Sequence, residues 1–290
     1  MKLSHGWSRR NFLRTIGSAV PTLNLMAEGV TPDTLLGTQL NGQQTKARFS
    51  PIDLTTYFTA SPADFGPREN AKSLCGGSRQ DGLIRTPAGK QELRGIPFLL
   101  GSEGTTEKKW LVLSKKNSSW SKPSLDIPVN QKVSFLCLAG FCDWDENESP
   151  LPGQYVIEKV GQPLAEVVLI YDDKTEKSLS VRRRFEVNAP STVWGHLSFT
   201  SLPHLEDLPR KLTDPLTGGM QWGDLQTAIW DNGYPSGPDG QPVAILWISC
   251  MENPDSLRPL KGLRLKAAGD DPVVLCGLTL FAGRNNPLRY

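Results

Sequence analysis

The feature that most constrains this chain is a series of short apolar runs rich in β-branched and aromatic residues. Each run is 4 to 10 residues long and is bounded by Gly, Pro, Asn or Asp, which form turns. The 27 Gly and 23 Pro of the sequence fit many turns better than long helices. We therefore predict an all-β protein. The predicted strands are residues 52–58, 110–113, 132–138, 165–171, 179–187, 243–250, 260–265 and 272–281.

Some of these runs are apolar without alternation, namely residues 135–139, 167–170, 244–248 and 273–276. A strand with one face in solvent alternates between apolar and polar residues, whereas a continuously apolar strand is covered on both faces. This pattern predicts a β-sandwich of the jelly-roll type, in which two sheets pack together and loops cover their outer faces. Residues 171–177 are polar and are predicted to form a hairpin turn between two of the strands.

The N-terminal residues resemble the twin-arginine export motif. A pair of arginines is followed by an aromatic and an aliphatic residue, in the order Arg9, Arg10, Phe12 and Leu13. A mildly apolar segment follows, which is too short to span a bilayer as a helix. The resemblance implies that the twin-arginine translocase exports the folded protein, so that it is periplasmic or extracellular.

The predicted organisation has three parts. Residues 1–27 form the signal peptide, residues 28–48 a polar arm or linker, and residues 49–290 a single jelly-roll domain. Removing the signal peptide takes away 4 of the 32 basic side chains and none of the 30 acidic ones, which changes the net charge from +2 to −2. A nearly neutral surface argues against a nucleic-acid partner, which requires a concentrated basic patch. No later run of about 18 apolar residues exists, so no transmembrane anchor is predicted.

The five cysteines are Cys75, Cys137, Cys142, Cys250 and Cys276. None are spaced as CxxC, and the three histidines do not complete a zinc-binding pattern. We predict buried free thiols, which behave as small apolar side chains. A disulfide between Cys250 and Cys276 is the alternative in an oxidising compartment.

The order of several short motifs resembles the galactose-binding-like jelly rolls attached to bacterial polysaccharide-degrading enzymes. The motifs are residues 94–98 (Arg-Gly-Ile-Pro-Phe), residues 171–173 (Tyr-Asp-Asp), Trp247 with residues 252–254 (Glu-Asn-Pro), and residues 277–279 (Gly-Leu-Thr). The hairpin motif departs from the family pattern, which has Asp-Gly where this chain has Asp-Asp-Lys. The resemblance covers roughly residues 50–282 and implies a carbohydrate-binding function.

Arg183 is a candidate ligand-binding residue. In the predicted strand 179–187, alternation places it on the same face as apolar neighbours, which are Leu179, Val181, Phe185 and Val187. A buried guanidinium needs an anionic or hydrogen-bonding partner. That partner is either the carboxylate of an acidic sugar, bound by both arms of the guanidinium, or an Asp or Glu of the same protein, which we favour.

An acidic loop is a candidate calcium site. Asp143, Asp145 and Glu148 lie between two predicted strands and supply the oxygen ligands that Ca²⁺ prefers. The spacing does not match an EF-hand, because the sixth position is Glu148 instead of Gly. The alternative is a solvated acidic loop, in which case the protein has no cofactor.

Aromatic residues gather where strand character is weakest, and they form the predicted glycan site: Trp194, His196, Trp222, Trp230 and Tyr234. Flat rings stack on the apolar faces of sugars. The same residues could instead cover one end of the sandwich.

Catalytic signatures such as G-x-S-x-G and H-E-x-x-H are missing from the sequence. We therefore predict an exported protein that binds a polysaccharide or oligosaccharide. Two alternatives stay open. One is a polysaccharide lyase or glycoside hydrolase that uses His196, His204 or the acidic loop. The other is the N-terminal module of a longer enzyme.

Overall fold

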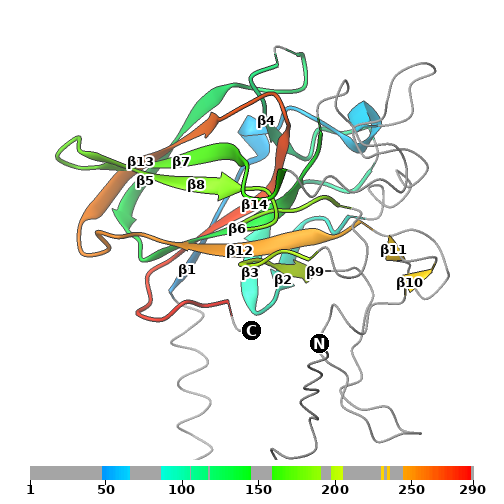
Figure 1. Ribbon diagram of the computed structural model, residues 1–290. Coiled ribbons are helices and arrows are strands. Elements are labelled where there is room, and N and C mark those ends of the chain that lie inside the picture. The colour runs from blue at the N-terminus through cyan, green and yellow to red at the C-terminus, as the bar shows by residue number, and fades with distance from the viewer. Residues whose placement is uncertain are drawn as a thin grey trace, which may run out of the picture. The chain divides into compact units, whose positions relative to one another are not determined.

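Two antiparallel sheets stack face to face in the computed structural model of this chain (Figure 1). The structure describes residues 48–65, 86–104, 106–116, 118–144, 159–190, 197–204, 230–231, 234–235 and 244–288. All of them belong to one compact unit, Gln44–Tyr290. No helix in these ranges is both long enough and apolar enough to cross a membrane.

The first sheet contains the most buried strands of the molecule. Its strands, in spatial order, are β1 (Phe49–Ile52), β14 (Val273–Phe281), β6 (Phe135–Cys142), β12 (Leu246–Glu252) and β9 (Leu202–His204). β4 (Leu111–Leu113) pairs with the first residues of β14, and β1 pairs with the last ones. β6 pairs with β14 along its whole length, so the two short strands share the opposite edge of β14.

The second sheet has four strands in the order β5 (Ser124–Lys132), β13 (Pro259–Ala267), β7 (Pro163–Tyr171) and β8 (Glu176–Arg182). The remaining described elements are small: the hairpins β2 (Lys90–Leu93) with β3 (Ile96–Leu99) and β10 (Trp230–Asp231) with β11 (Tyr234–Pro235), and the 3₁₀ helices η2 (Thr55–Tyr57) and η3 (Pro62–Phe65). The predicted all-β sandwich is therefore confirmed.

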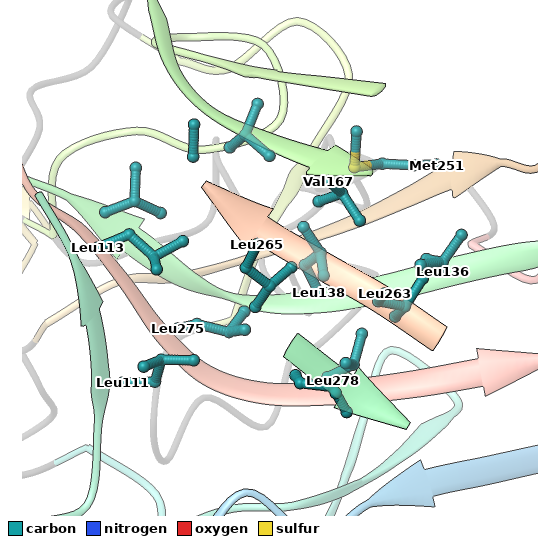
Figure 2. Close-up of a cluster of buried hydrophobic side chains, with 14 of the residues drawn as sticks. Leu111, Leu113, Leu136, Leu138, Val167, Met251, Leu263, Leu265, Leu275 and Leu278 are labelled. Atoms are coloured by element: carbon teal, nitrogen blue, oxygen red, sulfur yellow. The ribbon is translucent and has the colours of Figure 1, made fainter. Parts of the chain in front are cut away.

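The main core lies between the two sheets and is mostly aliphatic (Figure 2). Leu136 and Leu278 come from β6 and β14, while Val167 and Leu263 come from β7 and β13. Along β6 and β7 the residues that face this core recur at every second position, as the pleat of a strand requires. In β13 and β14 the register shifts by one residue, so the core-facing residues there skip from Leu260 to Leu263 and from Leu275 to Leu278.

A second core covers the outer face of the first sheet. It is built around aromatic rings, and the Trp110 and Phe141 rings meet edge to face with their centroids 5.5 Å apart. The β2–β3 hairpin packs closely over β14. Gly277 of β14 permits this approach, since a side chain there would collide with Leu100 and Phe98. Every residue of β6 and β14 is consequently buried. This confirms that the continuously apolar runs of these two strands are covered on both faces.

Several motifs from the sequence have clear structural roles. Arg94 and Gly95 are the two turn residues of the β2–β3 hairpin, and both have positive φ (56° and 77°), as a type I′ turn requires. Tyr171, which precedes the β7–β8 turn, donates a hydrogen bond from its hydroxyl to Asn253 Oδ1 (2.6 Å). Asn253 in turn donates to the carbonyl of Val133 (2.7 Å). The hairpin motif and the Asn-Pro motif thus contact each other in the core.

Three predicted strands continue through a turn or break that the sequence pattern did not show, and β5 was not predicted apart from Lys132. The predicted strand 52–58 ends at Ile52, because Asp53 Oδ1 accepts hydrogen bonds from the amide and hydroxyl of Thr55 (2.9 and 2.7 Å) and starts a turn. The predicted strand 132–138 is interrupted between Lys132 and Phe135, where the chain passes from the second sheet to the first. The third, strand 179–187, ends at Arg182 and is described below.

Candidate functional site

The chain leaves β8 in a tight turn that contains three consecutive arginines, which we call the arginine turn (residues 182–187). Arg184 adopts a left-handed conformation (φ 61°), and its amide donates to the carbonyl of Val187 (2.7 Å). The amide of Phe185 donates to the carbonyl of Arg182 (3.2 Å). This turn breaks the strand alternation that the sequence predicted up to Val187. As a result, Phe185 does not share a face with Arg183.

Arg183 is the buried arginine of the turn, with 2% of its surface exposed. Its Nη2 lies 3.1 Å from Asp271 Oδ2 and also donates to the carbonyl of Asp143 (2.8 Å). The guanidinium carbon lies 3.8 Å from the centroid of the Trp144 ring, close enough for a cation–π interaction. The predicted burial of Arg183 is confirmed, and its partner is a carboxylate of the same protein.

Asp271 holds this buried cluster together. It is only 4% exposed, and its Oδ2 also accepts a hydrogen bond from Gln162 Nε2 (3.1 Å) and lies 3.4 Å from Lys159 Nζ. Cys142 Sγ lies 3.6 Å from Arg183 Nη1. Burial raises the pKa of the Cys142 thiol to about 11, although the charge of Arg183 opposes the shift. The thiol is therefore neutral at physiological pH and unsuited to act as a nucleophile.

The other two arginines of the turn point away from this cluster and stack on aromatic rings. The guanidinium carbon of Arg182 lies 4.2 Å from the centroid of the Phe185 ring, and that of Arg184 lies 5.2 Å from the centroid of the Phe199 ring. The Phe185 and Phe199 centroids are 5.1 Å apart. These four residues form one connected group, which we call the Arg–Phe surface.

Phe199 is unusually exposed for an aromatic residue, with 58% of its surface accessible. Its position is nevertheless held by the backbone, because its amide donates to the carbonyl of Arg184 (2.8 Å). Arg184 Nε and Nη2 both donate to the carbonyl of Leu197 (3.3 Å each), and Arg182 forms an ion pair with Glu186 (2.7 Å). These hydrogen bonds and the ion pair hold the backbone and the arginines around Phe199 in place, while its ring faces solvent.

The predicted calcium site is only partly covered by the described residues. Asp143 is buried, and its Oδ1 accepts a hydrogen bond from the amide of Trp144 (2.8 Å). Asp145 and Glu148 lie outside the described residues. Among the residues that are described, no three His, Cys, Asp or Glu side chains gather in a way that could hold a metal ion.

Most of the predicted aromatic site also lies outside the described residues, including Trp194, His196 and Trp222. Trp230 and Tyr234 stand on the paired strands β10 and β11, where Tyr234 is opposite Asp231. His204 ends β9 opposite Leu246. The signal residues Arg9, Arg10, Phe12 and Leu13 likewise fall in a segment that the structure does not describe.

Sequence reasoning missed Phe185 and Phe199 as site residues. Phe185 was placed on the buried face of a strand that in fact ends three residues earlier. Phe199 was overlooked, although it is an aromatic residue with polar neighbours, which are Ser198, Thr200 and Ser201. A single aromatic residue in a polar segment without strand alternation was the signal that could have identified it.

Comparison with known proteins found no matching family model, no matching curated protein and no matching solved structure.

Proposed function

We propose that this protein is an exported carbohydrate-recognition protein whose sandwich is of the jelly-roll type. The observation that carries the proposal is the exposed Phe199 ring, held against Phe185 and bordered by Arg182 and Arg184. An exposed aromatic ring offers a flat apolar face for a sugar ring, and guanidinium groups beside it donate hydrogen bonds to hydroxyl or carboxylate oxygens.

The jelly-roll assignment is supported by the path of the chain between the sheets. The chain passes from the second sheet to the first and back in the order β5, β6, β7, and from the first sheet to the second and back in the order β12, β13, β14. Such repeated crossing is typical of a jelly roll, whereas a meander keeps consecutive strands in one sheet. The contact between Tyr171 and Asn253 also joins two motifs on which the resemblance to galactose-binding-like domains depends.

The proposed site is centred on the Arg–Phe surface and includes predicted aromatic residues. Trp194 and His196 precede Leu197 closely in the sequence, and Leu197 contacts Arg184. We keep them in the proposal, together with Trp222, Trp230 and Tyr234, as residues that stack on or bind the glycan. Arg183 takes a supporting role, because its guanidinium is enclosed by the protein's own acceptors.

A binding experiment tests this function directly. The mature protein would be screened on a glycan array, and the affinity for the strongest ligand would then be measured for Phe199→Ala. We expect a loss of about 1–3 kcal/mol, the scale of burying a large apolar side chain, which is roughly a 5- to 150-fold weaker affinity.

Leu257→Ala is the matched control, because Leu257 is the other large apolar residue that is strongly exposed in the described part of the chain (84%) and it belongs to a different turn. The affinity of Leu257→Ala for the glycan should equal that of the wild type. Equal affinities of Phe199→Ala and the wild type would remove the Arg–Phe surface from the site. A reducing-end release assay run in parallel would detect turnover, which would replace the binding function with an enzymatic one.

Export is tested separately. Replacing Arg9 and Arg10 with lysine should retain the precursor in the cytoplasm, because ammonium ions do not reproduce the geometry of paired guanidinium groups. Normal export of this variant in cells that lack the twin-arginine translocase would contradict the proposed localisation.

A further inference from the structure

Two cysteines face each other across the first sheet. Cys137 on β6 is directly opposite Cys250 on β12, and their Sγ atoms are 3.1 Å apart. Both are free thiols, and their sulfur atoms share a hydrogen bond. Residues opposite each other on antiparallel strands have Cα atoms about 4.5–5.5 Å apart, within the range of about 4.4–6.8 Å that disulfides span. Closing the gap to a bond of about 2.05 Å requires a shift of roughly 1 Å.

The sheet topology excludes the disulfide between Cys250 and Cys276 that the sequence left open. Cys276 belongs to β14, and β6 lies between β14 and β12. The two residues are therefore two strand spacings apart, about 9–10 Å, beyond the separation of about 7 Å that a disulfide bridges. Among the cysteines that the structure describes, Cys137 and Cys250 are the pair whose sulfur atoms are in contact.

The two thiols differ in access. Cys137 is completely buried, whereas Cys250 is half-buried. β9 pairs with β12 only at Leu246–Ile248, so within the described residues no strand lies beside Cys250 on that edge. The hydrogen bond with Cys250 and burial both raise the pKa of the Cys137 thiol. The first of these causes is lost once Cys250 forms a mixed disulfide, because its sulfur then carries no proton. A reagent from solution therefore reaches Cys250 first, and Cys137 is placed to react second.

We propose that Cys137 and Cys250 are a site of disulfide formation by exchange with a disulfide donor. The Cys250 thiolate attacks one sulfur of the donor, which breaks the donor's S–S bond and releases one thiol. The Cys137 sulfur then attacks Cys250 Sγ in this mixed disulfide and releases the second thiol. Two protein thiols are oxidised, the donor is reduced to two thiols, and the two protein thiol protons end on the released sulfurs.

The cross-link joins two segments that are distant in the sequence but adjacent in the fold. Cys137 and Cys250 are 113 residues apart. A disulfide that closes a loop of this length restricts the unfolded chain strongly and stabilises the folded state. This inference does not depend on the proposed carbohydrate binding, because it rests on the geometry of β6 and β12 alone.

The test is a thiol count on the full chain. Protein purified under reducing conditions has five cysteines. After incubation of the folded protein with oxidised glutathione, we expect three titratable thiols, a mass 2 Da lower (the loss of two hydrogens), and a Cys137–Cys250 cross-linked peptide. The melting temperature should rise by an amount on the order of 10 °C.

Three variants separate the outcomes. Cys276→Ala should still lose two thiols, from four to two. Cys250→Ala should keep all of its thiols, and Cys137→Ala should stop at a glutathione adduct on Cys250. If Cys137→Ala does not fold, the peptide map of the wild type alone decides the outcome. Five remaining thiols, a stable glutathione adduct on wild-type Cys250, or a cross-link between other cysteines would each overturn the proposal.

Discussion

The two sheets of this sandwich bury their residues differently. In the first sheet every residue of β6 and β14 is buried, because one face packs on the second sheet and the other lies beneath the β2–β3 hairpin and an aromatic cluster. In the second sheet β5 alternates, with Leu125, Ile127 and Val129 turned inward between exposed neighbours. The continuously apolar β6 and β14 thus belong to the layer that is covered twice, and the alternating β5 belongs to the layer that meets solvent. β7 departs from this division, because it carries the apolar run 167–170 in the second sheet.

Arginine side chains show the same contrast. Arg264 lies on the outer face of the second sheet, where it pairs with Asp126 (2.8 Å) and Glu176 (3.2 Å) while remaining about one-third exposed. Arg183, just beyond the end of β8, is nearly completely enclosed with Asp271. Water screens the ion pairs of Arg264 but not the pair of Arg183 with Asp271. The two arginines should therefore differ widely in their contribution to the stability of the fold.

The largest expected effect is the loss of the buried arginine. Arg183→Ala leaves the Asp271 carboxylate without its closest charged partner in a buried cluster, and breaking such a pair costs about 3–5 kcal/mol. Urea unfolding of the variant should show this loss in its free energy of unfolding. Arg182→Ala is the matched neighbour, since its side chain is 38% exposed, and it should lose much less. Equal losses for the two variants would contradict the contrast between buried and exposed arginines.

Substituting one leucine in each sheet compares how much the two sheets contribute to the free energy of unfolding through the core. Leu278 of β14 has no exposed surface, and Leu278→Ala should cost about 2–5 kcal/mol through lost burial and the cavity that remains. Leu179 of β8 is only partly buried against the same core, so Leu179→Ala should cost less. The comparison uses the free energies of unfolding of both variants. A larger loss at Leu179 would mean that the second sheet determines the stability of the sandwich.

The smallest expected effect is at the surface. Arg264→Ala removes two solvent-exposed ion pairs, which contribute little because water screens them and their side chains lose conformational freedom. The urea midpoint should shift only slightly, and the difference from the wild type should shrink further in about 1 M salt, where the screening length falls to about 3 Å. A large shift that persists in high salt would show that this outer face is not simply solvated.

Much of the fold was predictable because strand patterns are local. The continuous apolar runs of β6 and β14 and the polar hairpin after Tyr171 each depend on a few neighbouring residues. The period of two along β5 is equally local, although β5 was not among the predicted strands. The same local pattern predicted that Arg183 is buried. What local patterns could not show is the turn after Arg182, because Phe185 and Val187 continue the apolar alternation through a segment that is not a strand.

By itself, the sequence determined the β class, the doubly covered strands and the need of Arg183 for a partner. Only the tertiary structure decided which partner it has, because Asp271 is 88 residues away along the chain. It also decided that Cys250 faces Cys137, and that Phe185 and Phe199 meet beside two arginines. The physical reason is that burial leaves a periodic trace in neighbouring residues, whereas pairing across strands depends on the order and register of the sheet, which no short stretch of sequence contains.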